Sequence, residues 1–255
     1  ALILKESTNT GDGRYSNNGW LQELPHPVTK VTWDNYAAIS PATAKELGVD
    51  YNDIIKIKAG GRSLEIPVFI QPGSADKTIT IELGYGRSKT GIVGTGAGFN
   101  ANALLSKNEG LSPWLYTGVS VSKTGEKYEL VTSQEHQMFD KELTKDVAVK
   151  RGIIKEGTVT EYISNPHFLH EGKKNEQSTF YPDYQYTGLK WGMAVDMNKC
   201  LGCGECVIGC ISENNIPVVG KEQVKAGREM HWLRVDRYYS GDEEEPKVHN
   251  QIMLC

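Results

Sequence analysis

The cysteines of this chain are gathered at one point of the sequence, and they restrict its structure more than any other feature. None occurs in the first 199 of the 255 residues, four occur between residues 200 and 210, and the fifth is Cys255. Cysteines that form stabilising disulfides are spread along a chain, where they close loops. Thiols packed this closely are instead typical of a metal site. We therefore expect a metal-binding loop here and no disulfide framework.

The spacing of the four clustered cysteines indicates which metal group they bind. Cys200, Cys203, Cys206 and Cys210 are separated by two, two and three residues. This spacing is typical of a loop that wraps a [4Fe-4S] cube, and in two-cluster ferredoxins the fourth cysteine of such a run ligates the other cluster. We therefore assign Cys200, Cys203 and Cys206 to one cube and Cys210 to a second. In that arrangement this run by itself completes neither cube.

Other metal and thiol chemistries fit the spacing less well. A structural zinc site usually has two ligand pairs separated by about a dozen residues, and the cysteine run contains no such gap. A redox-active CxxC pair stands alone before a helix, whereas two CxxC units overlap here. The six histidines include no pair four residues apart and none beside a cysteine at ligand spacing. Most histidines are therefore expected at the surface or in packing.

Composition excludes several classes of protein. Hydrophobic residues make up 38% of the chain and charged residues 24%, and no apolar stretch is long enough for a membrane span. The net charge of −4 gives no reason to expect a nucleic-acid partner. The chain has no initiator Met and stops on a cysteine, so we expect it to be an internal piece of a longer protein.

Residues 1–165 are expected to form a mainly β domain. Short strand-like segments are separated by Gly, Pro, Asn and Asp, which favours a closed or nearly closed barrel. Gly60 and Gly61 predict the turn of a hairpin, and one helix is expected over residues 41–47, with Ser40 as its N-cap and Gly48 at its end. The predicted strands cover residues 28–33, 54–59, 63–70, 78–83, 118–122, 127–132 and 158–163.

The remaining residues are expected to form a linker and the start of an α+β domain. Residues 166–187 have two prolines, mixed charge and no sustained periodicity, which is typical of a linker. Residues 188–255 contain the cysteine run and an acidic stretch at 242–245 that predicts a turn. The predicted elements are strands at 191–195, 231–239 and 248–254 and a helix at 206–214.

The stretches around the cysteines resemble a known family. KWGMAVDMNKC (190–200), CISENNIPVVGKE (210–222) and GREMHWLRVDRYY (227–239) are similar to the four-cluster ferredoxin subunits of the molybdopterin oxidoreductase superfamily. NGWLQELP (18–25), TWDNY (32–36), ISPATAKELG (39–48) and GYGR (84–87) resemble that superfamily's molybdopterin-dinucleotide-binding domain, a double-psi-type barrel. Both halves in one chain, in this order, resemble the fused iron-sulfur subunit of the quinol-oxidising alternative complex III.

This resemblance implies a ligand set that extends beyond the chain. Ferredoxin subunits of this kind carry four cysteine runs, in which the first pairs with the fourth and the second with the third. The cluster of Cys200, Cys203 and Cys206 would then take its fourth ligand from a cysteine beyond residue 255. Cys210 would belong to the neighbouring cube, and Cys255 would open the second run. The 188–255 segment is therefore expected to be the N-terminal part of a ferredoxin-like domain.

The same resemblance points to loops that hold a pterin dinucleotide in catalytic relatives. The matching residues are Asp34, Asn35, Tyr85, Gly86 and Arg87, together with the stretch 94–100. The complex III branch does not retain the molybdenum cofactor, so these residues are expected to be structural and molybdopterin to be absent. Six glycines lie between residues 84 and 98, but no βαβ unit frames them, which argues against a Rossmann site.

Two functions are consistent with these features. The first is a non-catalytic electron-transfer subunit of a respiratory complex, which relays electrons from quinol through [4Fe-4S] clusters to a cytochrome or oxidase. Its partners would be cytochrome c subunits and a quinol-oxidising membrane subunit, and it would lie at the periplasmic face of the bacterial cytoplasmic membrane. The alternative is a molybdopterin-dependent oxidoreductase subunit, whose barrel binds the pterin dinucleotide. Molybdenum in the purified protein would distinguish the second from the first.

Overall fold

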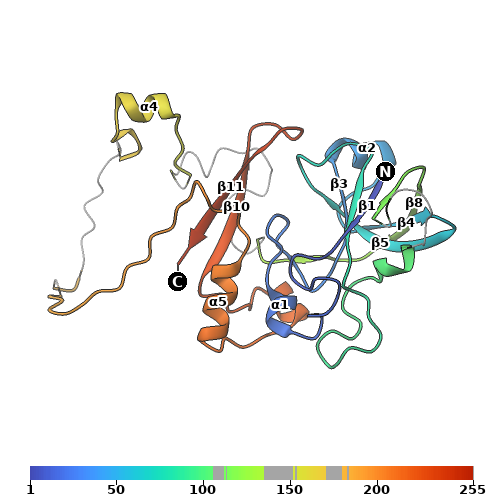
Figure 1. The fold of residues 1–255 in the computed structure, drawn as a ribbon, viewed down its shortest axis with the longest axis horizontal. Coiled ribbons are helices and arrows are strands. Elements are labelled where there is room, and N and C mark those ends of the chain that lie inside the picture. The colour runs from blue at the N-terminus through green and yellow to red at the C-terminus, as the bar shows by residue number, and fades with distance from the viewer. Residues whose placement is uncertain are drawn as a thin grey trace.

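The computed structural model describes residues 1–105, 112, 114–134, 152, 154–170, 180–182 and 184–254. Two parts of the chain lie against each other (Figure 1). One is formed by residues 1–134 and is called here the β domain. The other is formed by residues 196–254, carries four of the cysteines, and is called the cysteine segment.

The β domain is built on a seven-stranded mixed sheet. Its strands are ordered β7-β1-β6-β3-β5-β4-β8. The β1–β6 and β3–β5 pairs are parallel and the other pairs are antiparallel. The bounds are β1 (Leu2–Lys5), β3 (Ala37–Ile39), β4 (Asp53–Ala59), β5 (Arg62–Ile70), β6 (Ile79–Glu82), β7 (Leu115–Tyr116) and β8 (Ser120–Lys127). A mainly β N-terminal domain with a curled sheet is therefore confirmed.

The predicted hairpin at residues 54–70 is formed by β4 and β5. Gly60 and Gly61 both have positive φ, 55° and 77°, as a two-residue turn of type I′ requires. Ile55 then lies opposite Ile66 in the antiparallel register. Along β4, alternate residues are buried, because successive side chains of a strand point to opposite faces.

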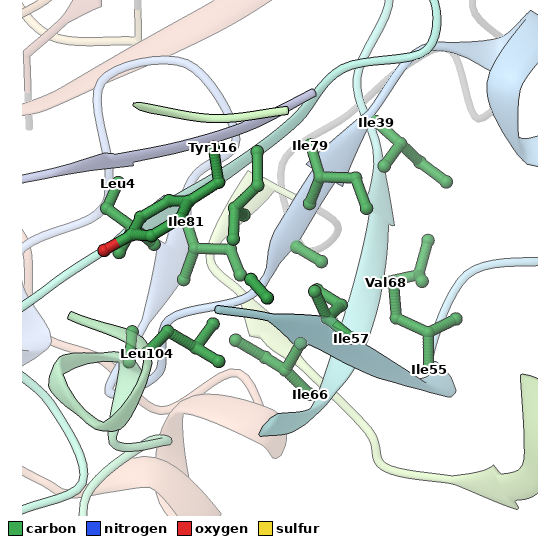
Figure 2. Packing of buried hydrophobic residues seen from close by; sticks show 14 of the residues in the cluster. Leu4, Ile39, Ile55, Ile57, Ile66, Val68, Ile79, Ile81, Leu104 and Tyr116 are labelled. Carbon is green, nitrogen blue, oxygen red and sulfur yellow. The ribbon is translucent and has the colours of Figure 1, made fainter. Parts of the chain in front are cut away.

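One apolar core fills the inside of this sheet (Figure 2). Its members come from every strand of the sheet except β8, and also from the 3-10 helix η1 (Ala101–Leu104). The residues labelled in the figure are Leu4, Ile39, Ile55, Ile57, Ile66, Val68, Ile79, Ile81, Leu104 and Tyr116. Each is at most 5% exposed, so this core is the main apolar source of the domain's stability.

Two short helices frame the strands. Helix α2 (Pro41–Leu47) begins where predicted: the Ser40 hydroxyl accepts a hydrogen bond from the N–H of Thr43, and Gly48 ends the helix with φ 63°. Helix α1 (Gly19–Glu23) is capped by the Asn18 side chain. Five residues with no apolar periodicity give α1 little signal in the sequence.

Several predicted elements differ in the structure. Residues 158–163 were predicted to be a strand but belong to helix α4 (Val159–Ser164), which a capping box between Thr158 and Glu161 starts. That local cap outweighs the strand preference of the β-branched residues. Of residues 28–33, only β2 (Val31–Thr32) is a strand, paired with β9 (Val131–Thr132). Strand β8 covers the gap between the predicted 118–122 and 127–132 segments.

The cysteine segment has two helices and one hairpin, with the bounds α5 (Glu205–Glu213), α6 (Lys221–Lys225), β10 (Arg234–Ser240) and β11 (Lys247–Met253). The acidic stretch at 242–245 forms the predicted turn, in which the Asp242 carboxylate accepts the N–H groups of Glu244 and Glu245, both at 3.0 Å. The predicted strand at 191–195 is wrong, because these residues pair with no strand and Trp191 is fully exposed. A ferredoxin-like fold for this segment stays a prediction.

The 166–187 linker and the domain limits are also predictions. The described linker residues include a short 3-10 helix, η3 (Phe168–His170). Among the residues that the structure describes, no helix has the length and apolar character needed to cross a bilayer.

Candidate metal centre and its contact with the β domain

The cysteine run forms a glycine-rich loop followed by a helix. Cys200 and Cys203 lie in the loop, and Cys206 and Cys210 lie on successive turns of α5. Gly202 has φ 69°, and a Cβ there would lie 2.6 Å from the Asn250 side-chain oxygen. Only glycine allows the loop to turn so tightly against β11. The Asn250 amide also donates a 3.4 Å hydrogen bond to the carbonyl of Cys200.

The Cys206 thiol is influenced by its two neighbours in the cysteine run. Burial raises the pKa of the Cys206 thiol, and the charges of Cys203 and Cys200 raise it further. Cys210 instead packs with the apolar cluster of Leu24, Val207, Leu233 and Val235. Cys203 and Cys206 are exposed whereas Cys200 and Cys210 are half-buried, and the assignment of Cys200, Cys203 and Cys206 to one cube stays a prediction. All four cysteines are free of disulfides, and Cys255 lies outside the described residues.

The thiols of this loop fit an iron-sulfur cluster by their chemistry. Thiolate is the ligand that such clusters take from proteins, and the run supplies one soft donor at every third position of a tight turn. In the described part of the chain, no group of three or more His, Cys, Asp or Glu side chains converges on a single point. This holds for the four described cysteines too, so their assignment to a cluster rests on their spacing and on the chemistry of the thiolate.

An apolar contact holds the helix of this loop against the β domain. Helix α5 lies beside α1 (Figure 1), and the apolar cluster around Leu24 and Val207 fills the space between them. Gly204, at the start of α5, has φ 82°, and its hydrogen atoms face the Leu24 side chain, since a Cβ there would be 3.4 Å from it. The N-terminus of helix α5 thus contacts the C-terminal end of helix α1.

A buried carboxylate adds a polar contact between the same two parts. Glu23, at the end of α1, is 3% exposed and accepts hydrogen bonds from the N–H groups of Val219 (3.1 Å) and Gly220 (2.8 Å). The Trp33 indole also donates to it, at 3.3 Å. Burial raises the pKa of Glu23, and these hydrogen bonds oppose that effect. Glu23 therefore fixes the chain that enters helix α6.

An ion pair joins Asp34, one of the predicted pterin residues, to the cysteine segment. The Lys221 ammonium lies 2.6 Å from an Asp34 oxygen whose side chain is 1% exposed. Lys221 also donates to the Tyr128 hydroxyl at 2.6 Å, and Tyr128 donates to Asp34 at 3.0 Å. Burial raises the pKa of Asp34, and Lys221 opposes the increase. Asp34 is thus committed to an internal contact.

The other predicted pterin residues also make internal contacts. The Asn35 amide donates to the carbonyls of Glu82 (2.7 Å) and Phe99 (2.9 Å), and its oxygen accepts the Phe99 N–H at 2.7 Å. Tyr85 is 5% exposed. A Cβ on Gly86, whose φ is 70°, would lie 2.1 Å from the Asn100 nitrogen. These three residues connect β6 to the 94–100 stretch.

Arg87 lies apart from that group, where its guanidinium donates to the carbonyl of Asp12 at 3.0 Å. The polar groups of Asp34 and Asn35 that a pterin would need are already engaged by the chain itself. The described geometry therefore fits a structural use of these residues better than a ligand-binding one.

Glu23 and Lys221, which have the most specific contacts, have no distinguishing sequence signal, because a buried charge looks like any surface charge in a sequence.

Comparison with known proteins finds a family match for the β domain and similar proteins named as iron-sulfur subunits. Residues 7–113 match the family described as Molydopterin dinucleotide binding domain. The chain is 40% identical over 53 residues to the menaquinone reductase iron-sulfur cluster-binding subunit of Nitratidesulfovibrio vulgaris, covering 21% of this chain and 20% of that protein. It is 54% identical over 26 residues to the arsenate respiratory reductase iron-sulfur subunit of Chrysiogenes arsenatis, covering 10% of this chain and 87% of that sequence.

Other matches cover small parts of much longer proteins. One subunit of the tetrathionate reductase of Archaeoglobus fulgidus is 35% identical over 75 residues, which are 29% of this chain and 7% of that protein. Among solved structures, acetylene hydratase from Pelobacter acetylenicus matches 48% of this chain and 18% of its own at 23% identity, with a TM-score of 0.34. The chain spans about a fifth of the menaquinone reductase subunit and about a tenth of a selenate reductase subunit from Mesobacillus selenatarsenatis.

Proposed function

Since this chain belongs with the iron-sulfur subunits of respiratory reductases and its residues 7–113 form a molydopterin dinucleotide binding domain, we propose that it is an electron-transfer module. The observation that carries the proposal is the spacing of Cys200, Cys203 and Cys206, which is typical of a [4Fe-4S]-binding loop. A bound [4Fe-4S] cluster exchanges one electron at a time. The chain's own residues hold that loop against the β domain through Leu24, Glu23 and Lys221.

In this proposal the β domain is a scaffold and docking surface. Asp34 pairs with Lys221 and Asn35 braces two loops, so neither side chain is available for a pterin. The match to a dinucleotide-binding family is in tension with the expectation that molybdopterin is absent. A pterin-dependent oxidoreductase subunit therefore remains the second candidate function, and the family match is the observation that favours it.

The wider setting is also part of the proposal. One relative is named as a subunit of a menaquinone reductase, which supports a quinone as the redox partner of the complex. We place this chain in a quinol-oxidising respiratory complex like alternative complex III, beside cytochrome c subunits and a membrane subunit. There it would lie at the periplasmic face of the bacterial cytoplasmic membrane and pass electrons to a cytochrome or oxidase.

Metal analysis of the purified protein that carries this chain tests the proposal. We expect iron and acid-labile sulfide, an EPR signal after reduction, and no molybdenum. Stoichiometric molybdenum would favour the second candidate. Protein that contains zinc, with no iron and no EPR signal, would refute both candidates.

The assignment of the cysteines has a test of its own. Cys203→Ala and Cys210→Ala are expected to perturb two different cluster signals, because the thiols are assigned to two cubes. EPR spectra of the reduced variants show which signal each one loses. Loss of the same signal in both variants would contradict the division. Ser212→Ala, a substitution on the exposed side of the same helix, serves as the control and should leave both signals unchanged.

A further inference from the structure

A small cavity separates the cysteine loop from the β domain. Its volume is about 40 Å³, and both parts of the molecule line it. The β domain contributes Lys30 and Gln134, the cysteine loop contributes Gly202 and Gly204, and β10 contributes Arg234 and Asp236. A cavity of this size holds at most a few water molecules, so its polar groups act on one another at close range.

The backbone places Lys30 in this cavity at a conformational cost. Lys30 has φ 61°, in the left-handed region that few residues other than glycine adopt. Its N–H donates to the carbonyl of His26 at 3.0 Å, and its carbonyl accepts the N–H of Ser133 at 3.1 Å. The β2–β9 pair begins at the next residue, Val31. Such a backbone persists only where its surroundings hold it, and it often marks a functional position.

The side chain of Lys30 is an almost completely buried cation. Lys30 is 3% exposed, and its ammonium makes no ion pair with a described carboxylate at 4 Å or less. Burial and then the charge of Arg237 lower its pKa to about 8, whereas Asp236 and the thiols of Cys200 and Cys206 favour its charged form. Asp236 itself pairs with Arg234 at 3.0 Å. The cysteine thiols are thus among the few groups that offset the burial of this cation.

A second donor faces the same cavity. Gln134 is 3% exposed, and its amide nitrogen has no hydrogen-bond partner in the described part of the chain. Its oxygen accepts the N–H of Arg237 at 2.9 Å, which fixes the amide and leaves the N–H groups for the cavity. The remaining titratable groups around the cavity are Glu229 and His231. The β domain therefore presents a cation and an amide donor toward the cysteine loop.

We propose that Lys30 compensates the negative charge of the cluster held by Cys200, Cys203 and Cys206 and raises the reduction potential of that cluster. Reduction adds one electron to a group that is already anionic. A fixed positive charge that is itself buried, as Lys30 is, is poorly screened and stabilises the reduced form more than the oxidised one. The β domain then tunes the electron-transfer site as well as supporting it. This inference rests on the proposed function.

Redox titration of the cluster-loaded protein, followed by EPR, tests the role of Lys30. The signal of this cluster is identified by its loss in Cys206→Ala. In Lys30→Met and Lys30→Gln, which remove the charge and shorten the side chain by one atom, we expect the equilibrium constant for one-electron reduction to fall at least about tenfold, or about 59 mV. Lys30→Arg keeps the charge and is expected to keep the potential.

Lys199→Met is the matched control. Lys199 is next to Cys200 in the sequence, but its side chain is 86% exposed, so water and salt screen its charge. We expect Lys199→Met to shift the potential far less than the Lys30 variants, and 1 M salt to abolish the small shift that it causes. The shift in the Lys30 variants should persist at that salt concentration, because the charge is buried.

Every other result of these redox titrations either supports or overturns the role of Lys30. An unchanged or raised potential in the neutral variants, or an equal shift in Lys199→Met, would overturn the inference. Loss of the cluster in both neutral variants but not in Lys30→Arg would support a need for positive charge. Loss in all three would overturn the inference, because the position would then serve only folding. Absence of iron and of an EPR signal from the unaltered protein would refute the proposed function itself.

Discussion

At the scale of single residues, the side chains that resemble a pterin site take structural positions here. Asn35 and Gly86 both hold the 94–100 stretch against β6, Asn35 by hydrogen bonds and Gly86 by close approach of two backbones. The sequence identified these positions as special but did not say why. In a sequence, a glycine or asparagine that a loop needs for packing looks the same as one that binds a ligand.

Gly86→Ala is expected to be much more destabilising than Gly96→Ala. Both glycines have positive φ, but a Cβ at Gly96 meets open space whereas one at Gly86 would lie 2.1 Å from the Asn100 nitrogen. We expect a loss of about 1 kcal/mol for Gly96→Ala from the backbone conformation alone, and roughly 3 kcal/mol or more for Gly86→Ala. Urea denaturation measures both. Equal losses would show that the close approach is absent.

Glu82 makes the stability of the protein sensitive to acid. Burial acts to raise its pKa, but the hydrogen bond from His26 and the charge of Lys5 oppose burial, and the pKa lies below its ordinary 4.5. The His26 Nδ1 accepts the N–H groups of Val28 and Thr29, so Nε2 carries the proton and donates to Glu82 at 3.2 Å.

A carboxylate with a lowered pKa contributes stability above its unfolded pKa and loses that contribution as the pH falls through the folded one. Glu82→Gln is therefore expected to flatten the fall in unfolding free energy below about pH 4.5. Denaturation at a series of pH values measures the slope. The exposed pair Lys56–Glu65 provides the control, since Glu65→Gln should leave the slope unchanged. An unaltered slope in Glu82→Gln would contradict the assignment.

At the scale of elements, local signals predicted some segments well and others poorly. Helix α2 has its Ser40 cap, its Pro41 start and its Gly48 end within nine residues, and it forms as predicted. Strand β4 alternates between buried and less buried residues before the two-glycine turn, whereas Ile66, Pro67 and Val68 of β5 are all buried. In contrast, residues 158–163 have strand composition, but the Thr158–Glu161 cap starts a helix. A specific capping hydrogen bond therefore outweighs the strand preference of the residues that follow it.

A buried ion pair joins helix α6 to the loop that carries Asp34, beside the apolar contact of Val224 with Trp33. A double-mutant cycle of Asp34→Asn and Lys221→Met is expected to give a coupling energy of about 1–3 kcal/mol, because a buried pair is little screened by water. The same cycle on Lys56 and Glu65, which are 39% and 51% exposed, should give under about 0.5 kcal/mol. Similar couplings in the two cycles would show that Asp34 is solvated in solution.

At the scale of the whole molecule, side chains from many parts of the sequence hold the cysteine segment against the β domain. Leu24, Glu23 and Asp34 lie early in the sequence, whereas Val207, Gly220 and Lys221 lie near its end. Arg237 also donates to the carbonyl of Val28 at 2.7 Å. Because apolar, hydrogen-bonded and charged contacts all cross this boundary, we expect the two parts to unfold together.

Hydrogen exchange measured on the amides of α5, α6 and β6 tests this joint unfolding. In the unaltered protein the slowest amides of all three elements should exchange with similar free energies of opening. Glu23→Ala, which removes the acceptor for Val219 and Gly220, should make α5 and α6 exchange faster than β6. The control is Glu65→Ala, whose half-exposed carboxylate pairs with Lys56 within the β4–β5 hairpin, away from the cysteine segment. An equal effect of the two variants would argue that Glu23 does not secure this contact.

The sequence by itself determined the spacing of the cysteine run, the mainly β character of the first part and the caps of α2, because each depends on residues close together in the chain. Only the tertiary structure decided that Asp34 pairs with Lys221, that Glu23 receives the turn before α6, and that Lys30 lies under the cysteine loop. These contacts join residues nearly two hundred positions apart. Burial gives them their strength, and burial exists only once the two parts have come together.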